Sequence, residues 1–234
     1  MYTTAGAGAE GRPLPLPYVP TAVLLDLDGT LVDSAPAILM ALRAAFSELG
    51  LPAQAPAELM RFVGPPLVDG FHLYAGLTGA ANAEAVATYR RHYRETMLDS
   101  PLYDGAAELV RGLHAAGMPL ALATSKHEGY AREILAHKGL ADCFTVVSGA
   151  RAGDVSGRKA AVIHSALQRL AAAGADLDRP VHVGDLDHDV QGARAEGVDC
   201  IGALWGYGSA EELRGAIALV TTPAELGALL GVEV

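Results

Sequence analysis

The chain has 234 residues, of which 51% are hydrophobic and 19% charged, so it can bury the core of a medium-sized globular domain. It carries 17 lysines and arginines against 27 aspartates and glutamates, a net charge of −10, which disfavours binding to nucleic acid. Its two cysteines, Cys143 and Cys200, form no metal-binding or disulfide-type spacing and fit a reducing compartment. We find no apolar run of membrane-spanning length and no signal peptide, and therefore expect a cytoplasmic protein.

Residues 1–20 combine small residues with spaced prolines and show no core periodicity, so we expect an irregular leader. From residue 21 onward, short apolar runs alternate with amphipathic stretches. Runs that are continuously apolar indicate strands covered on both faces, as in a parallel sheet. The expected strands are 22–28, 119–125, 144–149, 180–185, 200–206 and 218–221. The expected helices lie around 104–117, 127–138, 158–173, 188–197, 209–215 and 223–230.

Residues 36–100 break this alternation, because they show helical patterning and no convincing strand. A segment of this length is too long for a simple crossover between strands. We therefore predict an α/β protein with a Rossmann-like, doubly wound parallel sheet. The sheet domain would comprise residues 21–35 and 101–234, and residues 36–100 would form an inserted α-helical cap subdomain.

Two aspartates end the first apolar run, and Gly29 and Thr30 follow them at once. Strand alternation places Asp26 and Asp28 on the same side, where they repel each other unless a cation or a phosphate chemistry needs them there. A carboxylate at a strand end can attack phosphorus, and a second one can protonate the leaving oxygen and later deprotonate a water. The competing interpretation is an ordinary turn in which Asp and Thr cap a helix.

Hydroxyl and basic side chains follow later apolar runs. Thr124, Ser125 and Lys126 come after the second run, and hydroxyl and backbone N–H groups at a helix start are suited to phosphate oxygens. The same residue types also cap helices that bind no ligand. Lys159 begins a predicted helix, where its charge opposes the helix dipole unless it points into an anionic site. Arg158 can serve instead, and a solvated basic pair is the alternative.

In the segment VHVGDLDHDV, residues 181–190, a short predicted strand is followed by three aspartates, Asp185, Asp187 and Asp189. Hard oxygen ligands of this kind suit Mg²⁺, which uses one or two protein carboxylates beside a substrate phosphate. Asp185 and Asp189 are four residues apart and share a face on a helical turn, whereas Asp187 points elsewhere. A lone histidine, His188, is weak support for a histidine-ligated metal.

Taken together and in this order, DLDGTLVDS, ATSK, Lys159 and VGDLDHDV resemble the four motifs of the haloacid dehalogenase superfamily of phosphohydrolases. The inserted helices resemble the cap of its phosphoglycolate phosphatase and β-phosphoglucomutase-like branch. FVGPPL and GALWGYGSAEEL resemble members of the phosphoglycolate phosphatase-like or 5′-nucleotidase-like type. The chain departs from the family before Lys159, where the common Lys-Pro pairing is missing, so whether Arg158 or Lys159 faces the site stays open.

The resemblance implies a Mg²⁺-dependent phosphomonoesterase that acts on a small phosphorylated metabolite through an aspartyl-phosphate. The substrate would be of the phosphoglycolate or nucleoside 5′-monophosphate type. Asp26 would be the nucleophile and Asp28 the general acid–base, while Thr124, Ser125 and Lys159 would bind the phosphoryl group. The implied Mg²⁺ ligands are Asp26, the backbone carbonyl of Asp28, Asp185 and Asp189.

The inserted segment is expected to cover the site and to set its specificity. Packing between cap helices is the alternative role for the candidate substrate contacts, which are Phe62, Gly64, Pro65 and His72. A basic cluster in the same segment can contact an anionic leaving group, although a solvated helix face is the preferred interpretation. This cluster comprises Arg90, Arg91, His92 and Arg94.

Two other functions stay open. A phosphomutase of the β-phosphoglucomutase type would pass the phosphoryl group to a sugar. A non-catalytic phospho-acceptor or ligand-binding protein would gather similar residues around Mg²⁺, but the two-residue spacing of Asp26 and Asp28 and the long insertion favour turnover. We expect a small phosphorylated metabolite as partner, no nucleic acid and no membrane, and a monomer or homodimer.

Overall fold

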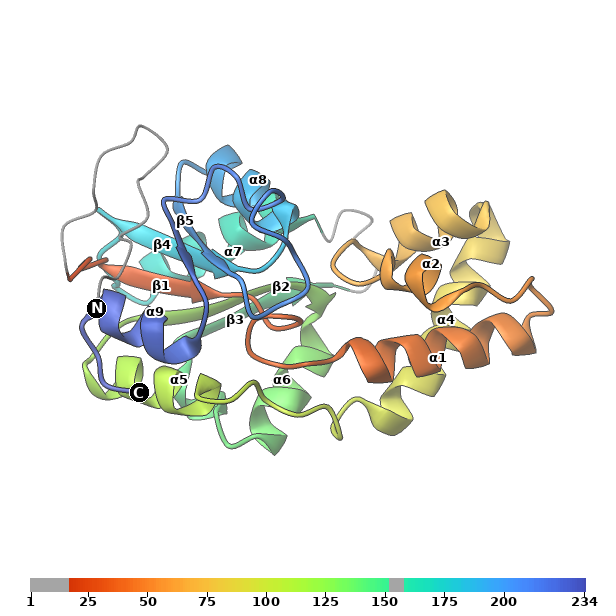
Figure 1. Cartoon of the computed structure of the whole chain (residues 1–234), viewed down its shortest axis with the longest axis horizontal. Helices are drawn as coiled ribbons and strands as arrows, with labels where there is room; N and C mark the ends of the chain where they lie inside the picture. Colours follow the sequence, from red (N-terminus) through yellow and green to blue (C-terminus); the bar gives the residue numbers. More distant parts are fainter. Residues whose placement is uncertain (1–16, 152–157) are drawn as a thin grey trace.

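The fold is built on a six-stranded sheet whose strands all run parallel, in the order β3-β2-β1-β4-β5-β6 (Figure 1). The structure, a computed structural model, describes residues 17–151 and 158–234. The predicted doubly wound α/β class is confirmed. The strands are β1 (Ala22–Leu25), β2 (Leu120–His127), β3 (Val146–Ala150), β4 (Pro180–Gly184), β5 (Asp199–Ala203) and β6 (Ala218–Val220).

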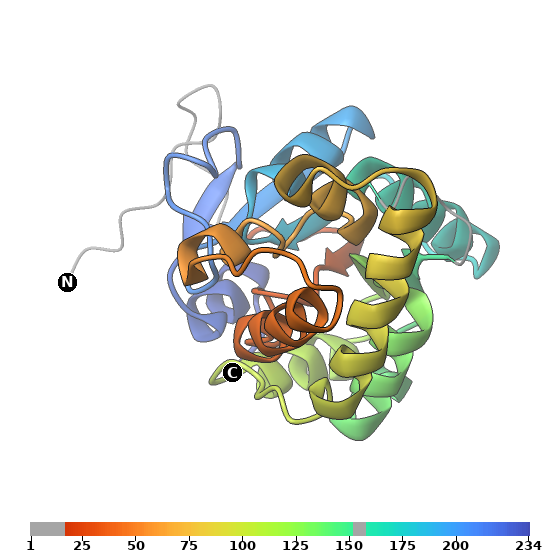
Figure 2. The same ribbon diagram turned by 90° about the vertical axis from the view of Figure 1, so that its right-hand side faces the viewer.

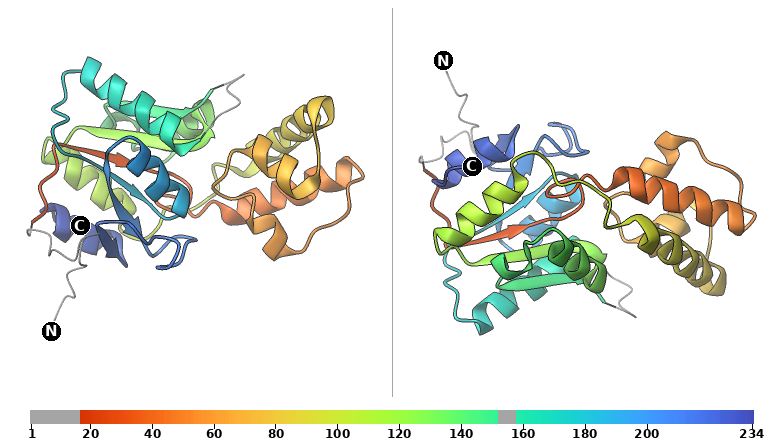
Figure 3. Two further views of the ribbon diagram at one scale, coloured as in Figure 1. Left: turned by 90° about the horizontal axis from the view of Figure 1, so that it is seen from above. Right: turned by 90° about the horizontal axis from the view of Figure 1, so that it is seen from below.

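Helices cover both faces of the sheet, which explains why the strand sequences are continuously apolar (Figure 3). Val23 and Leu25 of β1 pack into the core shared with α5, α6 and α9. Ala22 and Leu24 point the other way and pack against α7 and α8. These helices are α5 (Ala106–Ala115), α6 (Glu128–His137), α7 (Lys159–Ala172), α8 (Asp187–Ala195) and α9 (Pro223–Leu230), with a 3₁₀ turn at Ala141–Cys143.

The strand order reverses between β1 and β4. After β1 the chain moves outward through β2 and β3, and then crosses back to place β4 on the other side of β1. In open α/β sheets, ligands bind at the carboxyl ends of the strands that flank such a switch point. Asp26 follows β1 directly and Asp185 follows β4 directly, so the topology brings two sequence-distant acids to this edge.

Residues 36–100 are helical and contain no strand, and Figures 1 and 2 show their helices beyond the carboxyl edge of the sheet. The two connections to the sheet run side by side: Val32 and Leu102 form an antiparallel bridge, and the N–H of Asp33 donates to the carbonyl of Pro101 at 2.9 Å. The division into separate domains stays a prediction. The helices are α1 (Ala35–Glu48), α2 (Pro56–Met60), α3 (Leu67–Ala75) and α4 (Gly79–Thr96).

Aromatic rings hold α1, α3 and the end of α2 together. Phe71 of α3 is fully buried, and its ring centroid lies 5.9 Å from that of Phe46 and 5.4 Å from that of Phe62. Tyr74 extends this cluster to within 5.3 Å of Phe62. These contacts form an aromatic cluster inside the helical segment.

The helix predicted at 209–215 is wrong, because this segment forms turns. The N–H of Leu213 donates to the carbonyl of Ser209 at 3.0 Å, which closes one helical turn. Gly215 then takes a φ of +109° and directs the chain into β6. The segment does have an amphipathic pattern, but the pattern covers a single turn, and one turn is too short to form a stable helix.

Of the leader predicted at residues 1–20, residues 1–16 lie outside the described residues. Tyr18 is buried: its N–H donates to the carbonyl of Leu229 at 2.8 Å, and its hydroxyl donates to Asp199 at 2.9 Å. The last residues of the predicted leader are therefore fixed to the core. Among the helices in 17–151 and 158–234, none is both long enough and apolar enough to cross a bilayer.

Replacing Phe71 by alanine should reduce the free energy of unfolding by about 3–5 kcal/mol, because it leaves a cavity in the aromatic cluster. Leu73→Ala, on the same helix but 65% exposed, is the matched control and should change stability by less than about 0.5 kcal/mol. Urea unfolding measures both values. Equal effects of the two substitutions would show that this cluster is not the core of the helical segment.

Candidate active site

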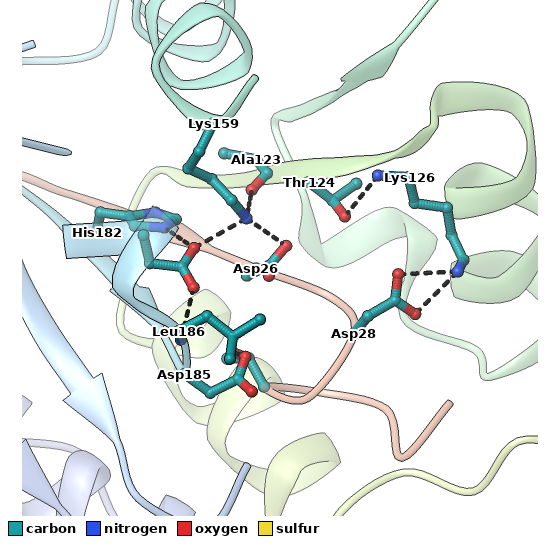
Figure 4. Close-up of polar contacts among 11 residues, drawn as sticks. Asp26, Asp28, Ala123, Thr124, Lys126, Lys159, His182, Asp185 and Leu186 are labelled. Carbon is teal, nitrogen blue, oxygen red and sulfur yellow. Dashed lines mark hydrogen bonds and ion pairs between the residues drawn. The ribbon is translucent and has the colours of Figure 1, made fainter. Parts of the chain in front are cut away.

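Three buried carboxylates and one buried ammonium form the centre of the site (Figure 4). Oxygens of Asp26, Asp185 and Asp189 lie within 4.8 Å of one another. The Nζ of Lys159 lies 2.8 Å from Asp26 Oδ1 and 2.8 Å from Asp189 Oδ1, and it donates to the carbonyl of Ala123 at 3.3 Å. Three carboxylates around one ammonium leave an excess of negative charge, which is the donor set of a divalent cation site.

Two glycines allow this close approach. Gly29 has a φ of +85°, and a Cβ at this position would collide with the carboxylate of Asp185. Gly184 ends β4, and a Cβ there would collide with the carboxyl group of Asp189. The glycines next to the acidic motifs are therefore required by the packing of the acids themselves.

The pKa values of the three carboxyl groups are shifted in different directions. Burial raises the pKa of Asp26, with Lys159 opposing the shift, and it raises the pKa of Asp185 well above its usual value, with Asp189 and Asp26 adding to the effect. Burial also acts to raise the pKa of Asp189, but Lys159 and His182 together hold it well below its usual range. A bound cation would relieve the mutual repulsion that these shifts express.

Asp189 is fixed by groups from β4 and from the start of α8. Its Oδ1 lies 2.9 Å from Nε2 of His182, which is fully buried, and its Oδ2 accepts the N–H of Leu186 at 3.0 Å. His182 is a site residue that no sequence motif predicted. A histidine inside the apolar run PVHVG is the signal that could have revealed it, since buried imidazoles require a polar partner.

Asp185 is fixed by the loops after β1 and β5. Its Oδ1 accepts the hydroxyl of Thr30 at 3.2 Å, and its Oδ2 accepts the N–H of Tyr207 at 2.8 Å. Both oxygens of Asp185, like both oxygens of Asp189, are thus engaged. Asp26 is the member of the cluster that also lines the open pocket, so its carboxylate is the one that a ligand in the pocket can reach.

The loop after β5 also holds the first connection to the helical segment. Trp205 Nε1 donates to the carbonyl of Thr30 at 2.9 Å. The hydroxyl of Tyr207 donates to Asp33 at 3.0 Å and accepts the N–H of Ala35 at 2.9 Å. One loop therefore contacts both the acidic cluster and the start of α1, a link that the motif GALWGYGSAEEL did not predict.

Asp28 lies outside the cluster of three and is paired with Lys126. The Nζ of Lys126 lies 2.9 and 2.8 Å from the two oxygens of Asp28, and 4.5 Å from the ring centroid of Tyr93 on α4. Burial acts to lower the pKa of Lys126, but Asp28 and Tyr93 raise it above its ordinary value. The sequence alone gave Lys126 no separate role. Its partner, Asp28, lies 98 residues away in the sequence, so no local pattern connects the two residues.

Thr124 and Ser125 lie in β2, in agreement with the predicted strand 119–125, and a few residues before the helix predicted at 127–138. The strand β2 continues to His127, and α6 begins only at Glu128, because the pairing with β3 shifts register between Ala123 and His127 and then resumes. Thr124 Oγ1 accepts the N–H of Lys126 at 3.2 Å. Both hydroxyl residues line the pocket.

The basic residue that faces the acids is Lys159. Its side chain is buried between Asp26 and Asp189, whereas Arg158 is exposed at the N-terminal end of α7. Asp187 also points away, as expected, and pairs with His188 and Gln191.

The pocket lies between the sheet edge and the helical segment. Phe62, Gly64 and Pro65 line it, although Phe62 is mainly a packing residue of the aromatic cluster. His72 does not line this pocket: it is exposed on α3, with Nδ1 3.3 Å from the carbonyl of Leu77. The carboxyl edge of the sheet contributes Asp26, Asp28, Thr124, Ser125 and Lys126 to the pocket wall, and α4 contributes Tyr89, Arg90 and Tyr93.

The family model for haloacid dehalogenase-like hydrolases matches residues 23–203. The chain belongs to this family, which confirms the resemblance seen in the four motifs and makes the protein an enzyme of the hydrolase class.

The chain is also similar to several individual proteins and to a solved structure. The chain is 36% identical over 193 residues to a 5′-nucleotidase of Pseudomonas aeruginosa (82% of this chain, 86% of that protein). It is 34% identical over 226 residues to a phosphoglycolate phosphatase of Rhodospirillum rubrum (91% and 92%). It is 39% identical over 219 residues to the tyrosine-protein kinase PtkA of Mycobacterium tuberculosis (91% and 73%). The crystal structure of a predicted phosphatase from Clostridium acetobutylicum superimposes with a TM-score of 0.82 at 32% identity, covering 89% of this chain and 96% of that one.

Asp185→Asn should stabilise the metal-free protein at pH 7, because it removes a buried carboxyl group whose ionisation the cluster opposes. Between the ordinary pKa of 3.8 and the raised value in the folded state, the folded protein binds more protons than the unfolded chain. The stability of the unsubstituted protein therefore falls as the pH rises through that window. We expect a gain of about 0.5–3 kcal/mol, or about 2–4 °C in Tm for each kcal/mol, in EDTA at pH 7, and a smaller gain at pH 5.

Thermal unfolding in EDTA between pH 5 and pH 7.5 measures this effect. Asp187→Asn, at the exposed acid two residues further along the chain, is the control and should leave Tm unchanged. A lower Tm for Asp185→Asn at pH 7 would contradict the account of mutual repulsion.

Proposed function

We propose that the protein is a Mg²⁺-dependent phosphomonoesterase that hydrolyses a small phosphorylated metabolite of the phosphoglycolate or nucleoside 5′-monophosphate type. The observation that carries this proposal is the position of Asp26, which belongs to the buried acidic cluster and also lines the open pocket. Its other neighbours in the cluster have both oxygens occupied. Membership of the hydrolase family and the phosphatase names of several relatives support the same reaction class.

The acidic cluster fits a divalent cation. Its three carboxylates are buried, lie within 4.8 Å of one another, and share the single ammonium of Lys159 among the described residues. We assign Asp26, Asp185 and Asp189 as the Mg²⁺ ligands, together with the backbone carbonyl of Asp28. When bound, Mg²⁺ supplies the positive charge that lets an anionic phosphate approach the Asp26 carboxylate.

In the first half of the proposed reaction, an oxygen of Asp26 forms a bond to phosphorus and the ester P–O bond breaks. Asp28, which has to be protonated when the ester binds, gives its proton to the leaving oxygen, so the product departs with a neutral hydroxyl group. Lys159, 2.8 Å from Asp26, and the hydroxyl of Thr124 offset the charge on the transferring phosphoryl group. The result is an aspartyl-phosphate on Asp26.

In the second half, Asp28 takes a proton from a water whose oxygen attacks the phosphorus. The bond between phosphorus and Asp26 breaks, which releases inorganic phosphate and restores both carboxyl groups. Once Asp28 is ionised, the ion pair with Lys126 holds both of its oxygens and orients the carboxylate toward the pocket. Lys126 therefore acts as a positioning residue for the proton transfers.

The helical segment is proposed to act as a cap. A Cβ at Gly64 would collide with Leu186, so the loop after α2 is in direct contact with the loop that carries Asp185. Together with Tyr93 beneath Lys126, this contact closes the space above the carboxylates from two sides. Exclusion of water in this way strengthens the charge interactions during phosphoryl transfer.

Transfer of the phosphoryl group to an acceptor other than water is the second candidate. The similarity to a protein named as a tyrosine kinase favours it, as that name describes transfer to a tyrosine hydroxyl. Transfer to a sugar phosphate, as in a phosphomutase, would use the same aspartyl-phosphate. Both alternatives predict phosphorylated acceptor in place of released phosphate, so one assay distinguishes them.

Purified protein should release inorganic phosphate from at least one small ester in a Mg²⁺-dependent manner. The ester panel contains phosphoglycolate, nucleoside 5′-monophosphates and hexose phosphates, with ATP plus a tyrosine peptide as the kinase arm. Asp26→Asn should lower kcat by about 10³-fold or more, because it removes the nucleophile. Asp187→Asn, an exposed acid in the same motif, should keep the activity of the unsubstituted protein.

Full activity of Asp26→Asn would refute the nucleophile assignment. Formation of phosphorylated peptide without phosphate release would indicate transfer to tyrosine. Formation of a rearranged sugar phosphate without phosphate release would indicate a phosphomutase. Either product would contradict hydrolysis as the function.

A further inference from the structure

A lysine and an arginine line the pocket that opens onto Asp26, and among the described residues only the lysine is paired. Lys126 contacts both oxygens of Asp28. Arg90 forms no ion pair and no side-chain hydrogen bond with any residue in 17–151 or 158–234, although it is half-buried. A guanidinium that is partly withdrawn from water without a partner is suited to bind an anion.

The neighbours of Arg90 on α4 serve a different purpose. Arg91 and His92 both pair with Glu48 of α1, at 2.5 and 2.8 Å, and hold two helices of the cap together. Arg94 is exposed. The sequence predicted that these four basic residues form one solvated helix face. In the structure they have different surroundings, and Arg90 is the one that lines the pocket.

Arg90 also lies near the reacting groups. It is three residues before Tyr93, one helical turn away, and the ring of Tyr93 lies beneath the ammonium of Lys126. His127 lines the same wall, and burial together with the charge of Arg90 lowers the pKa of this imidazole. At neutral pH, Arg90 is therefore the uncompensated positive charge of this wall among the described residues.

We propose that Arg90 forms a subsite for a second negative charge on the leaving group of the substrate. This inference rests on the proposed phosphomonoesterase function and narrows it. The substrate class would be a short phosphate monoester whose alcohol carries a carboxylate or a second phosphate, both of which the planar guanidinium binds with two parallel hydrogen bonds. A nucleoside, which is an uncharged leaving group, would gain nothing from Arg90.

Local charge matters here because the protein as a whole repels such a substrate. The chain has a net charge of −10, and the pocket floor contains the carboxylates of Asp26 and Asp28. A dianionic phosphate with a further negative group would need a dedicated cation at its far end to bind productively.

The test compares two esters of the same length, phosphoglycolate and 2-hydroxyethyl phosphate, which differ in a carboxylate against a hydroxymethyl group. The measured quantity is the ratio of their kcat/KM values. The unsubstituted protein should prefer phosphoglycolate, and Arg90→Gln should lower the ratio by about ten- to hundredfold, the loss expected for a charge-assisted contact. Arg91→Gln, the adjacent arginine that pairs with Glu48, should leave the ratio unchanged.

Arg90→Lys keeps the charge but loses the planar fork, so it should give an intermediate ratio and separates a charge effect from misfolding. An unchanged ratio in Arg90→Gln, with both esters hydrolysed, would overturn the subsite and leave the phosphomonoesterase function intact. A nucleoside 5′-monophosphate that outperforms phosphoglycolate and is insensitive to Arg90→Gln would overturn it as well. Absence of Asp26-dependent phosphate release from every ester would instead refute the underlying function.

Discussion

Mutual repulsion among three buried carboxylates is the constraint on which the site depends. Asp26, Asp185 and Asp189 are held within 4.8 Å of one another, and Lys159 compensates two of them directly. Such a cluster is unfavourable unless further positive charge is supplied on binding. In the proposed function, the same deficit of positive charge would provide affinity for a cation and, with it, for a phosphate ester.

The surrounding fold can be understood as the means of holding these charges in place. The reversal of strand order between β1 and β4 brings Asp26 and Asp185 to one edge, and glycines at 29 and 184 remove the side chains that would keep the acids apart. Polar groups from β4 and from the loop after β5 engage Asp189 and Asp185, which leaves Asp26 facing the pocket. The two acids that are held by neighbouring groups and the acid that lines the pocket are thus distinguished by their hydrogen bonds rather than by residue type.

Most of the fold and the core of the site were predictable because their signals are local. Continuously apolar runs followed by carboxylates identify parallel strands and their carboxyl ends from a few adjacent residues, as at Asp26 and Asp185. Contacts across the fold were not predictable: Lys126 pairs with Asp28, 98 residues away in the sequence. Arg90 lines the pocket and Arg91 pairs with Glu48 of α1, a difference that depends on how α4 packs in the folded protein. The prediction of a helix at 209–215 was wrong for another reason, because a single amphipathic turn and a short helix have the same sequence pattern.

In the proposed reaction the carboxylate of Asp26 itself becomes phosphorylated during turnover. To detect this, we would quench the protein during turnover of its best ester, reduce it with borohydride and map the modified residue by mass spectrometry. We expect position 26 to be converted to homoserine, the reduction product of an aspartyl-phosphate, and the signal to depend on the ester. Reduction at Asp28 or at another carboxylate, or the absence of any reduced residue during rapid turnover, would contradict it.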